Sequence, residues 1–220
     1  MTVDGKKTQG ISVVTTTWNE RENIAELIRR VRQTLADKEH EVIVVDDSSS
    51  DGTYEVAKKL ADVAVSKARE GQSKGLLDGM KLAKFPIVVT IDSDLENSPE
   101  LIPVLVDKLA GCDIVVAGRT LVPRWSERFA AKTLGKWVGV SDFYSNFRAC
   151  SREVIANLRL VGDETFGGEM LVAAKKKGYR INEVLYEAPP RRSRPRIGGS
   201  LKANLRISWA TVKCFMRYAF

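Results

Sequence analysis

Short apolar runs alternate with longer stretches of helical periodicity through the first half of the chain. The runs are rich in valine and isoleucine, and most of them reach a polar or acidic residue at the C-terminal end. Continuous runs of this length are typical of strands in a parallel sheet covered on both faces. The predicted strands are ISVVTT (11–16), EVIVVD (41–46), PIVVTID (86–92) and DIVVAG (113–118).

Helices are predicted between these strands and after them. In 20–36 apolar residues recur at helical spacing, and 98–110 opens with Ser98-Pro99-Glu100, a favourable helix start. The other predicted helices are 53–61, 73–83, 125–136, 164–177 and a last helix from about 201 to the end. Alternation of strand and helix predicts a doubly wound α/β sheet, in which ligands bind beyond the carboxyl ends of the strands.

The second half of the chain is less regular. Residues 179–187 predict one more strand, and the prolines, glycines and arginines of 189–199 predict a loop that is mobile in the free protein. We therefore expect one α/β domain over 1–200, with a regular half over about 10–118 and a less regular half over about 119–200. A C-terminal amphipathic helix is expected over 201–220.

Composition narrows the class of protein. An apolar content of 44% supplies a core and 29% charged residues fit a soluble surface, while no stretch approaches the roughly 20 apolar residues of a membrane span. The segment MTVDGKKTQG lacks the apolar block of a secretory signal. Cys112, Cys150 and Cys214 form no Cys-x-x-Cys pair, which fits a reducing compartment. We expect a cytoplasmic protein that does not cross a bilayer.

The net charge of +7 favours anionic partners and is concentrated near the C-terminus. Residues 191–196 read RRSRPR, and the last helix carries a basic arc beside an apolar one. That pairing suits a helix lying in the headgroup plane of a membrane. Docking against the α/β domain and binding of a small membrane partner subunit are the alternatives. The basic arc is Lys202, Arg206, Lys213 and Arg217, and the apolar arc is Leu205, Trp209, Val212, Met216 and Phe220.

Two acidic clusters follow predicted strands. Asp92-Ser93-Asp94 follows VVTI, and unpaired like charges at a buried strand end call for a cation. Two oxygen ligands plus substrate phosphates is the usual way of holding Mg²⁺ or Mn²⁺. The alternative is a turn or cap before the 98–110 helix.

The second cluster, Asp46 to Thr53, follows EVIVV. Asp51-Gly52 makes a tight turn and Thr53 can cap the next helix, which leaves Asp46 and Asp47 as hydrogen-bond acceptors for a base or ribose. Two acidic strand ends on one sheet edge therefore predict a nucleotide–metal site.

Several motifs, in order from about residue 11 to 202, resemble those of family 2 glycosyltransferases with the GT-A fold, and most closely of dolichyl-phosphate mannose synthases. The three longest are 16–24, 46–53 and 92–100. The shorter ones are Lys74-Gly75-Leu76, Gly118-Arg119, Phe147-Arg148, Glu169-Met170, Glu183-Val184 and Gly198-x-Ser200-x-Lys202. The resemblance implies a GT-A catalytic domain over 1–200, with a Rossmann-like, mostly parallel sheet. Its nucleotide-binding half would be about 10–118 and its acceptor half about 119–200.

The resemblance also implies roles in donor binding. Asp92 and Asp94 would hold the metal on the diphosphate, with Glu96 within reach in place of the family's glutamine, a departure that bears on metal preference and sugar choice. Trp18 could pack on the nucleoside or be a core or rim residue, and Glu20 could instead favour the helix dipole. The nucleotide-binding set is Thr16, Trp18, Glu20, Asp46, Asp47, Lys74, Asp92 and Ser93.

On the acceptor side, a sugar hydroxyl would need a general base, and the lone histidine, His40, precedes a strand far from the acidic clusters. A lipid phosphate is already anionic and needs only cations. Direct displacement by that phosphate inverts the anomeric carbon, so no covalent nucleophile is expected. With Asp94, the expected catalytic residues are Arg119, Arg128, Arg196 and Lys202, with Arg194 as a rival to Arg196 and a solvated helix charge as the alternative for Arg128.

The sequence thus predicts transfer of a hexose, by resemblance mannose from GDP-mannose, to a dolichyl or polyprenyl phosphate at the cytoplasmic face of a membrane, with Mg²⁺ or Mn²⁺. A UDP-sugar-dependent transferase acting on the same lipid or on a glycan is the enzymatic alternative. The alternative without catalysis is an inactive scaffold that binds membrane or nucleic acid. Nucleic acid is not an expected partner of the enzyme.

Overall fold

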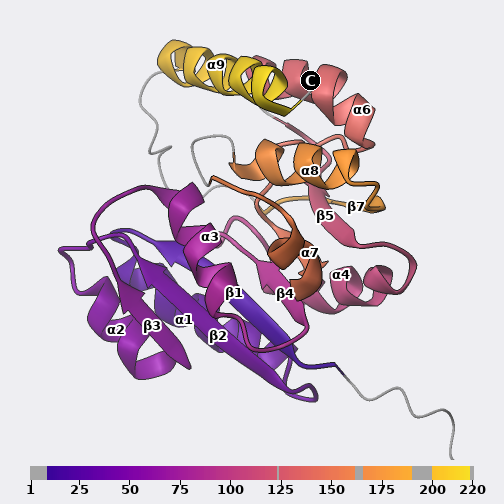
Figure 1. The fold of residues 1–220 in the computed structure, drawn as a ribbon. Coiled ribbons are helices and arrows are strands. Elements are labelled where there is room, and N and C mark those ends of the chain that lie inside the picture. Colours follow the sequence, from indigo (N-terminus) through magenta and orange to yellow (C-terminus); the bar gives the residue numbers. More distant parts are fainter. Residues whose placement is uncertain (1–8, 123, 162–165, 190–199, 219–220) are drawn as a thin grey trace, which may run out of the picture.

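A computed structural model of the 220-residue chain describes residues 9–122, 124–161, 166–189 and 200–218. These residues form a seven-stranded sheet in the order β3-β2-β1-β4-β6-β5-β7 (Figure 1). Every pairing is parallel except those of β6, which runs antiparallel to both β4 and β5. The strands are β1 (Ile11–Thr17), β2 (His40–Asp46), β3 (Val63–Ser66), β4 (Ile87–Thr90), β5 (Ile114–Arg119), β6 (Arg148–Ser151) and β7 (Ile181–Tyr186).

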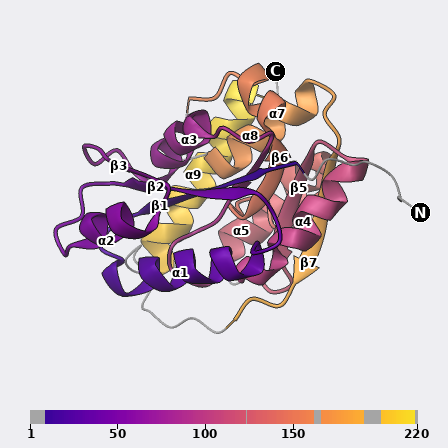
Figure 2. The ribbon, with the colours of Figure 1, turned by 90° about the horizontal axis from the view of Figure 1, so that it is seen from below.

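Helices cover both faces of the sheet (Figures 1 and 2). One apolar cluster packs α1, α2 and α4 on one face, and a second packs α3, α7 and α8 on the other. The bounds are α1 (Arg21–Thr34), α2 (Thr53–Leu60), α3 (Gln72–Leu82), α4 (Ile102–Lys108), α5 (Trp125–Ala130), α6 (Lys136–Val138), α7 (Arg152–Asn157), α8 (Phe166–Lys176) and α9 (Ser200–Tyr218). Short 3₁₀ turns, η1 (Pro99–Leu101) and η2 (Leu109–Gly111), flank α4, and a π-helical turn, η3 (Ala131–Gly135), joins α5 to α6.

The predicted α/β class and mostly parallel sheet are confirmed. The four strands expected in the first half are β1, β2, β4 and β5, and the strand expected over 179–187 is β7. Sequence reasoning missed β3, β6 and α7. The expected helix over 125–136 is interrupted by η3. The loop expected over 189–199 lies, from residue 190 onward, outside the described residues.

The C-terminal helix α9 packs against its own domain. Asn204 Oδ1 accepts a hydrogen bond of 2.6 Å from the Ser126 hydroxyl of α5, and Thr211 Oγ1 lies 2.8 Å from the Tyr144 hydroxyl oxygen. Cys214 belongs to the apolar cluster that α8 also joins. Docking on the domain, one of the alternatives for this helix, is therefore observed. No helix in the described part of the chain is long and apolar enough to span a bilayer.

Candidate active site

The two acidic clusters lie at one edge of the sheet. Strand β1 pairs in parallel with β2 on one side and β4 on the other, so the three carboxyl ends point the same way. Asp46 is the last residue of β2 and sits in register with Thr17 of β1, while Asp92 follows β4 by two residues. The expectation that both clusters share an edge is confirmed.

A residue with a left-handed backbone follows each of these three strands. Asn19 has φ 53°, Ser48 φ 61° and Leu95 φ 62°. Asparagine tolerates this region, but a branched, buried leucine does so at a cost of about 1–3 kcal/mol. Backbone strain of this kind is typical of binding sites, and these three residues with positive φ all lie at the sheet edge that carries the carboxylates.

Hydrogen bonds join the β1–α1 turn to the β2–α2 turn. The Asn19 amide N–H donates to Ser49 Oγ at 2.9 Å, and the Glu20 amide N–H donates to Thr53 Oγ1 at 2.9 Å. The expectation that Thr53 caps its own helix is therefore wrong: α2 begins after Gly52 (φ 89°) without a side-chain cap, and the hydroxyl serves the neighbouring turn instead. Glu20 is the N-cap residue of α1 and accepts from the Asn23 side-chain amide, which favours the helix-end alternative for this carboxylate.

Asp46 and Asp47 differ in what they contact. Both Asp47 oxygens accept backbone N–H groups, from Glu70 at 2.8 Å and Gly71 at 2.9 Å, so this carboxylate holds the loop before α3. Asp46 Oδ2 accepts from the Ser49 N–H at 2.9 Å, whereas its buried Oδ1 has no hydrogen-bond partner among the described residues. Asp46 Oδ1 is therefore an unsatisfied, buried acceptor at the end of β2. The nucleotide-binding role of both residues stays a prediction.

Trp18 lies at the rim of this edge and carries a cation on its ring. The Arg69 guanidinium carbon is 3.6 Å from the ring centroid, a cation–π contact. Lys74, predicted to bind nucleotide, has its ammonium 3.7 Å from Asp78, which also pairs with Lys67 at 2.9 Å. Sequence reasoning missed Arg69, because a charged residue in the linker before α3 gives no periodic signal.

Asp92 is a buried carboxylate with a strongly raised pKa. Side-chain amides of Gln72 and Asn97 donate to its two oxygens, and the Glu96 N–H donates to Asp94 Oδ1 at 3.1 Å. Burial first, and the Asp94 charge second, raise the pKa of Asp92 to about 7. A bound cation would relieve both effects.

The donor set fits a divalent cation held jointly with a ligand. Across the described residues no three acidic, histidine or cysteine side chains come close enough to hold a metal by themselves, so Glu96 does not complete a preformed three-ligand site there. Mg²⁺ and Mn²⁺ favour one or two carboxylates plus phosphate oxygens. Asp92 and Asp94 match that requirement, and the metal role of Asp92, Asp94 and Glu96 stays a prediction.

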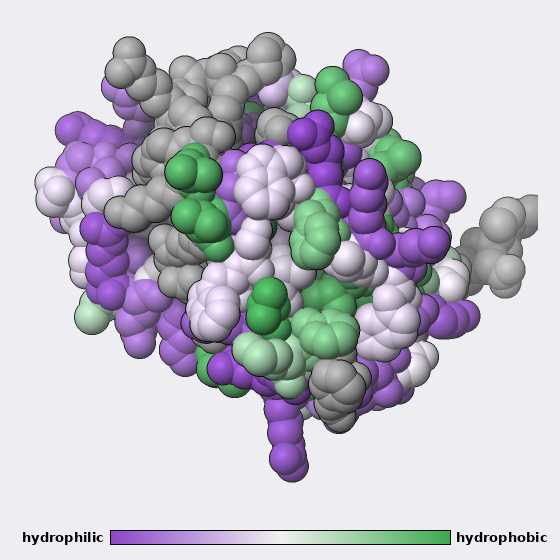
Figure 3. Space-filling model, turned by 90° about the horizontal axis from the view of Figure 1, so that it is seen from above, coloured by the Kyte–Doolittle hydropathy of each residue, from purple (hydrophilic) through white to green (hydrophobic). Residues whose placement is uncertain are grey.

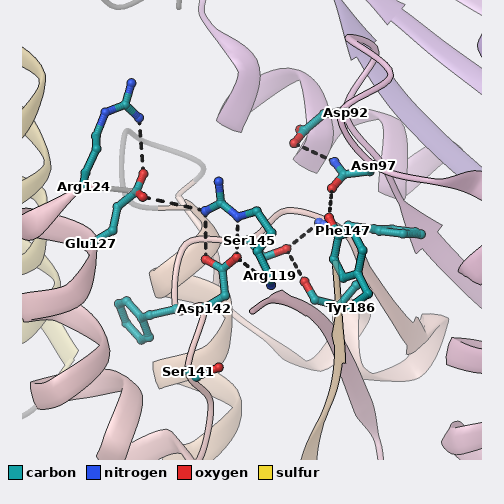
Figure 4. Close-up of polar contacts among 12 residues, drawn as sticks. Asp92, Asn97, Arg119, Arg124, Glu127, Ser141, Asp142, Ser145, Phe147 and Tyr186 are labelled. Atoms are coloured by element: carbon teal, nitrogen blue, oxygen red, sulfur yellow. Dashed lines mark hydrogen bonds and ion pairs between the residues drawn. The ribbon is translucent and has the colours of Figure 1, made fainter. Parts of the chain in front are cut away.

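An arginine–carboxylate network lies beside the acidic cluster (Figure 4). Arg119, at the end of β5, donates to Asp142 from Nε at 2.6 Å and from Nη2 at 3.1 Å. Its Nη2 is also 3.8 Å from Glu127 Oε2, and Arg124 pairs with the same carboxylate at 3.3 Å. Asp142 and Glu127 are buried residues that sequence reasoning missed. Arg119 is thus fixed in place by two carboxylates, and its predicted contact with a phosphate stays a prediction.

Glu183 on β7 holds the loop that carries Asp142. Its carboxylate accepts from Ser141 N–H at 2.9 Å, Ser141 Oγ–H at 2.8 Å and Asp142 N–H at 2.9 Å. Gly118 leaves the space for this carboxylate, because a Cβ there would lie 2.3 Å from Glu183 Oε1. These contacts give a structural reason for two of the sequence motifs, Gly118-Arg119 and Glu183-Val184.

Tyr186 connects the acidic cluster to β7. The buried Tyr186 hydroxyl, at the end of that strand, donates to Asn97 Oδ1, and Asn97 in turn donates to Asp92 at 3.2 Å (Figure 4). The Arg119 charge also acts on the Asp92 carboxyl, lowering its pKa against the larger effect of burial. The candidate metal residues and the arginine network therefore form one continuous polar centre.

The remaining predicted residues are placed in part. Arg128 is exposed on α5, as its solvated alternative requires. Arg194, Arg196 and the side chain of Lys202 lie outside the described part of the chain. Thr16 and Ser93 are buried at the ends of β1 and β4. His40 begins β2, at the opposite end from Asp46, so it lies away from the acidic clusters as expected.

Comparison with known proteins gives a consistent family. Residues 12–157 match the family described as "Glycosyl transferase family 2". A dolichol-phosphate mannosyltransferase of Pyrococcus furiosus is 34% identical over 172 residues, or 68% of this chain and 48% of the relative. An undecaprenyl-phosphate 4-deoxy-4-formamido-L-arabinose transferase of Aeromonas hydrophila subsp. hydrophila is 33% identical over 162 residues, or 66% and 50%. The chain spans about half the length of these curated relatives.

Among solved structures, glucosyl-3-phosphoglycerate synthase of Mycobacterium tuberculosis, in complex with phosphoglyceric acid, superimposes with a TM-score of 0.80 at 27% identity. The match covers 98% of this chain and 82% of the other. The same mycobacterial protein has been crystallised with Mn²⁺, UDP and glucosyl-3-phosphoglycerate, with a TM-score of 0.79 at 26% identity and coverage of 98% and 82%.

Proposed function

This chain belongs to glycosyl transferase family 2, and we propose that it transfers a sugar from a nucleoside diphosphate to a polyprenyl phosphate with inversion at the anomeric carbon. The observation that carries the proposal is the polar centre itself. Carboxylates at the ends of β2 and β4, the two strands that flank β1, share one sheet edge with an arginine network, and the single histidine of the chain begins β2 at the other end of that strand.

The donor half of the proposal rests on Asp46, Asp92 and Asp94. Asp46, whose Oδ1 has no hydrogen-bond partner among the described residues, is assigned to the ribose or base, and Asp92 and Asp94 would hold Mg²⁺ or Mn²⁺. When bound, such a cation supplies positive charge to the departing diphosphate. Gln72 and Asn97 orient the Asp92 carboxylate by donating to its two oxygens.

The acceptor half rests on charge rather than on proton transfer. A phosphate monoester is anionic at neutral pH, so its oxygen attacks the sugar without a general base. It needs fixed cations beside the anomeric carbon, and Arg119 is fixed by its two bonds to Asp142. Arg128, Arg196 and Lys202 are proposed to contribute further positive charge.

The relatives support a lipid phosphate acceptor and leave the donor as a choice between two classes. The Pyrococcus furiosus relative is a dolichol-phosphate mannosyltransferase, which favours GDP-mannose. The second candidate is a UDP-sugar, since the mycobacterial structure holds UDP with Mn²⁺ and Glu96 departs from the glutamine of the mannose synthases. We propose mannose first, with action at the cytoplasmic face of a membrane.

The test supplies labelled GDP-mannose or UDP-glucose with polyprenyl phosphate in detergent, with Mn²⁺ or Mg²⁺. We expect label to pass into the organic phase with one donor and only with metal. Asp92→Asn should reduce this transfer by about 10²-fold or more, because a charge is lost where the leaving group departs. Asp107→Asn, on the exposed side of α4, is the matched control and should leave it unchanged. Label that appears only in a soluble glycan would overturn the lipid-acceptor proposal.

A further inference from the structure

Most of the large apolar side chains that the described structure exposes lie in two segments, one around α5 and α6 and the other in α9. Trp125 is 50% exposed, Trp137 46% and Trp209 56%. Figure 3 looks down on this side of the molecule and shows aromatic and apolar side chains gathered between hydrophilic ones. We call this surface the apical face. The exposed apolar residues of the two segments are Leu121, Trp125, Phe129, Trp137, Leu201, Leu205, Trp209, Val212, Phe215 and Met216.

The apolar side chains of α9 are exposed although the helix packs against the domain, because a different side of the helix is buried there. Asn204 accepts from Ser126, Thr211 contacts Tyr144, and Cys214 is buried in the core. The apolar arc of the helix therefore points away from the domain although a different arc holds it in place. A monomeric soluble protein rarely gathers so many large apolar groups on one surface without a partner.

The charges around the apical face are nearly all positive. Lys132 and Lys136 are exposed on the stretch from α5 to α6, and α9 contains four basic and no acidic residues. The one acidic residue of 121–138 is Glu127, which is buried and paired with Arg124 and Arg119. The Glu127 carboxylate points into the molecule, so the exposed charged side chains of this segment are all basic.

We propose that the apical face is a docking surface for an anionic lipid bilayer. Tryptophan at an apolar–polar boundary and long basic side chains around it are the features that favour the headgroup region of a membrane. A second copy of the chain fits less well, because a two-fold contact would bring the same cations face to face. This inference goes beyond the proposed reaction and does not depend on it.

The same helix links the apical face to the candidate active site. On α5, Trp125 and Phe129 point outward and are exposed, while Glu127 points inward and lies 3.8 Å from Arg119. A bilayer bound at the apical face is therefore one helix away from the arginine network. A phosphate carried at the headgroup level would approach from that side.

The test is co-sedimentation of the full chain with vesicles, without donor or acceptor. We expect binding to vesicles containing about 30 mol% phosphatidylglycerol and much weaker binding to pure phosphatidylcholine, with loss of binding at high salt. The variant Trp125→Ala/Trp209→Ala should weaken binding about tenfold or more, because the apolar anchors are removed. Lys132→Glu/Lys136→Glu should do the same for anionic vesicles, because it reverses the attraction.

Matched controls separate this surface from general stickiness or charge. Leu60→Ala and Lys58→Glu/Lys59→Glu change an exposed apolar residue and two exposed lysines of α2, and both should bind vesicles like the wild type. Circular dichroism verifies that each variant is folded. Transfer to a short-chain polyprenyl phosphate in detergent should survive in the tryptophan variant, so failure of docking and failure of the reaction are distinguishable. Equal vesicle binding by all variants would overturn the proposal. So would a wild-type dimer that is lost in the Trp125→Ala/Trp209→Ala variant, because the face would then be a contact between two copies of the chain.

Discussion

Asp92 shows how a single carboxylate can be kept ready for a cation. Two amides hold its oxygens, and Tyr186 fixes one of those amides from the end of β7. Burial and the Asp94 charge raise its pKa to about 7, so the folded chain holds a proton there more tightly than the unfolded chain, where the pKa is about 4. Without metal, this residue therefore favours folding at low pH, and the contribution is lost as pH rises through 7.

The first prediction follows from the raised pKa of Asp92. Stabilisation of the folded chain by Mn²⁺, measured as the rise in Tm by differential scanning fluorimetry, should be larger at pH 8 than at pH 5.5, since the metal competes with the proton on Asp92. Asp92→Asn should remove most of the Mn²⁺ effect at both pH values. A shift of the same size at pH 5.5 and 8 would contradict this assignment.

The second prediction concerns Gly118. Gly118→Ala places a Cβ 2.3 Å from Glu183 Oε1, so the carboxylate must leave the Ser141 and Asp142 amides. We expect a loss of about 1–3 kcal/mol in the free energy of unfolding and reduced transferase activity, as Asp142 no longer fixes Arg119. Gly111→Ala is the control, since nothing lies within 4 Å of its Cβ position. Urea denaturation of both variants measures the difference, and equal stability would refute the crowding at Gly118.

At the residue scale, sequence reasoning found the carboxylates that follow strands and missed their partners. Asp46 and Asp92 were recognisable because each comes directly after an apolar run. Asp142 and Glu127 have no such signal, because only the tertiary fold brings them into contact with Arg119. Asp142 lies 23 residues from Arg119 in the sequence. Thr53 was assigned to its own helix because capping is local, whereas its hydroxyl oxygen accepts from the Glu20 N–H, 33 residues away, and its proton goes to Asp51.

At the scale of elements, the helices and strands with strong periodicity were predicted and the weak ones were not. Strand β6 (Arg148–Ser151) has four residues, a buried arginine and three small side chains, so it gives no run of large apolar residues. Strand β3 (Val63–Ser66) is an edge strand of four residues. Both are stabilised by pairing with neighbours, which a local pattern does not report.

The third prediction concerns the attachment of α9. Asn204→Ala removes the acceptor of the buried Ser126 hydroxyl and should cost about 1–3 kcal/mol, because that donor is left unpaired. Hydrogen exchange in α9 should then accelerate more than in the sheet. Val212→Ala, on the exposed side of the same helix, should leave exchange in α9 unchanged. Unaltered protection in the Asn204 variant would mean that other contacts hold the helix.

At the scale of the whole molecule, strand–helix alternation was enough to predict the sheet and the edge at which ligands bind. The order of the strands was not predictable, since the antiparallel β6 inserts between β4 and β5. The apolar and basic arcs of α9 were visible in the sequence, but the contribution of α5 and α6 to the same face was not. That face combines segments more than sixty residues apart, and only folding brings them together.

The central claim is that the acidic strand ends bind a nucleoside diphosphate through a divalent cation. Calorimetric titration of the chain with GDP and with UDP, each with and without Mn²⁺, tests it most directly. We predict that one of the two nucleotides binds only when Mn²⁺ is present and that Asp92→Asn abolishes this binding, while Asp107→Asn preserves it. Binding that is equally strong without Mn²⁺, or that persists in Asp92→Asn, would contradict the claim.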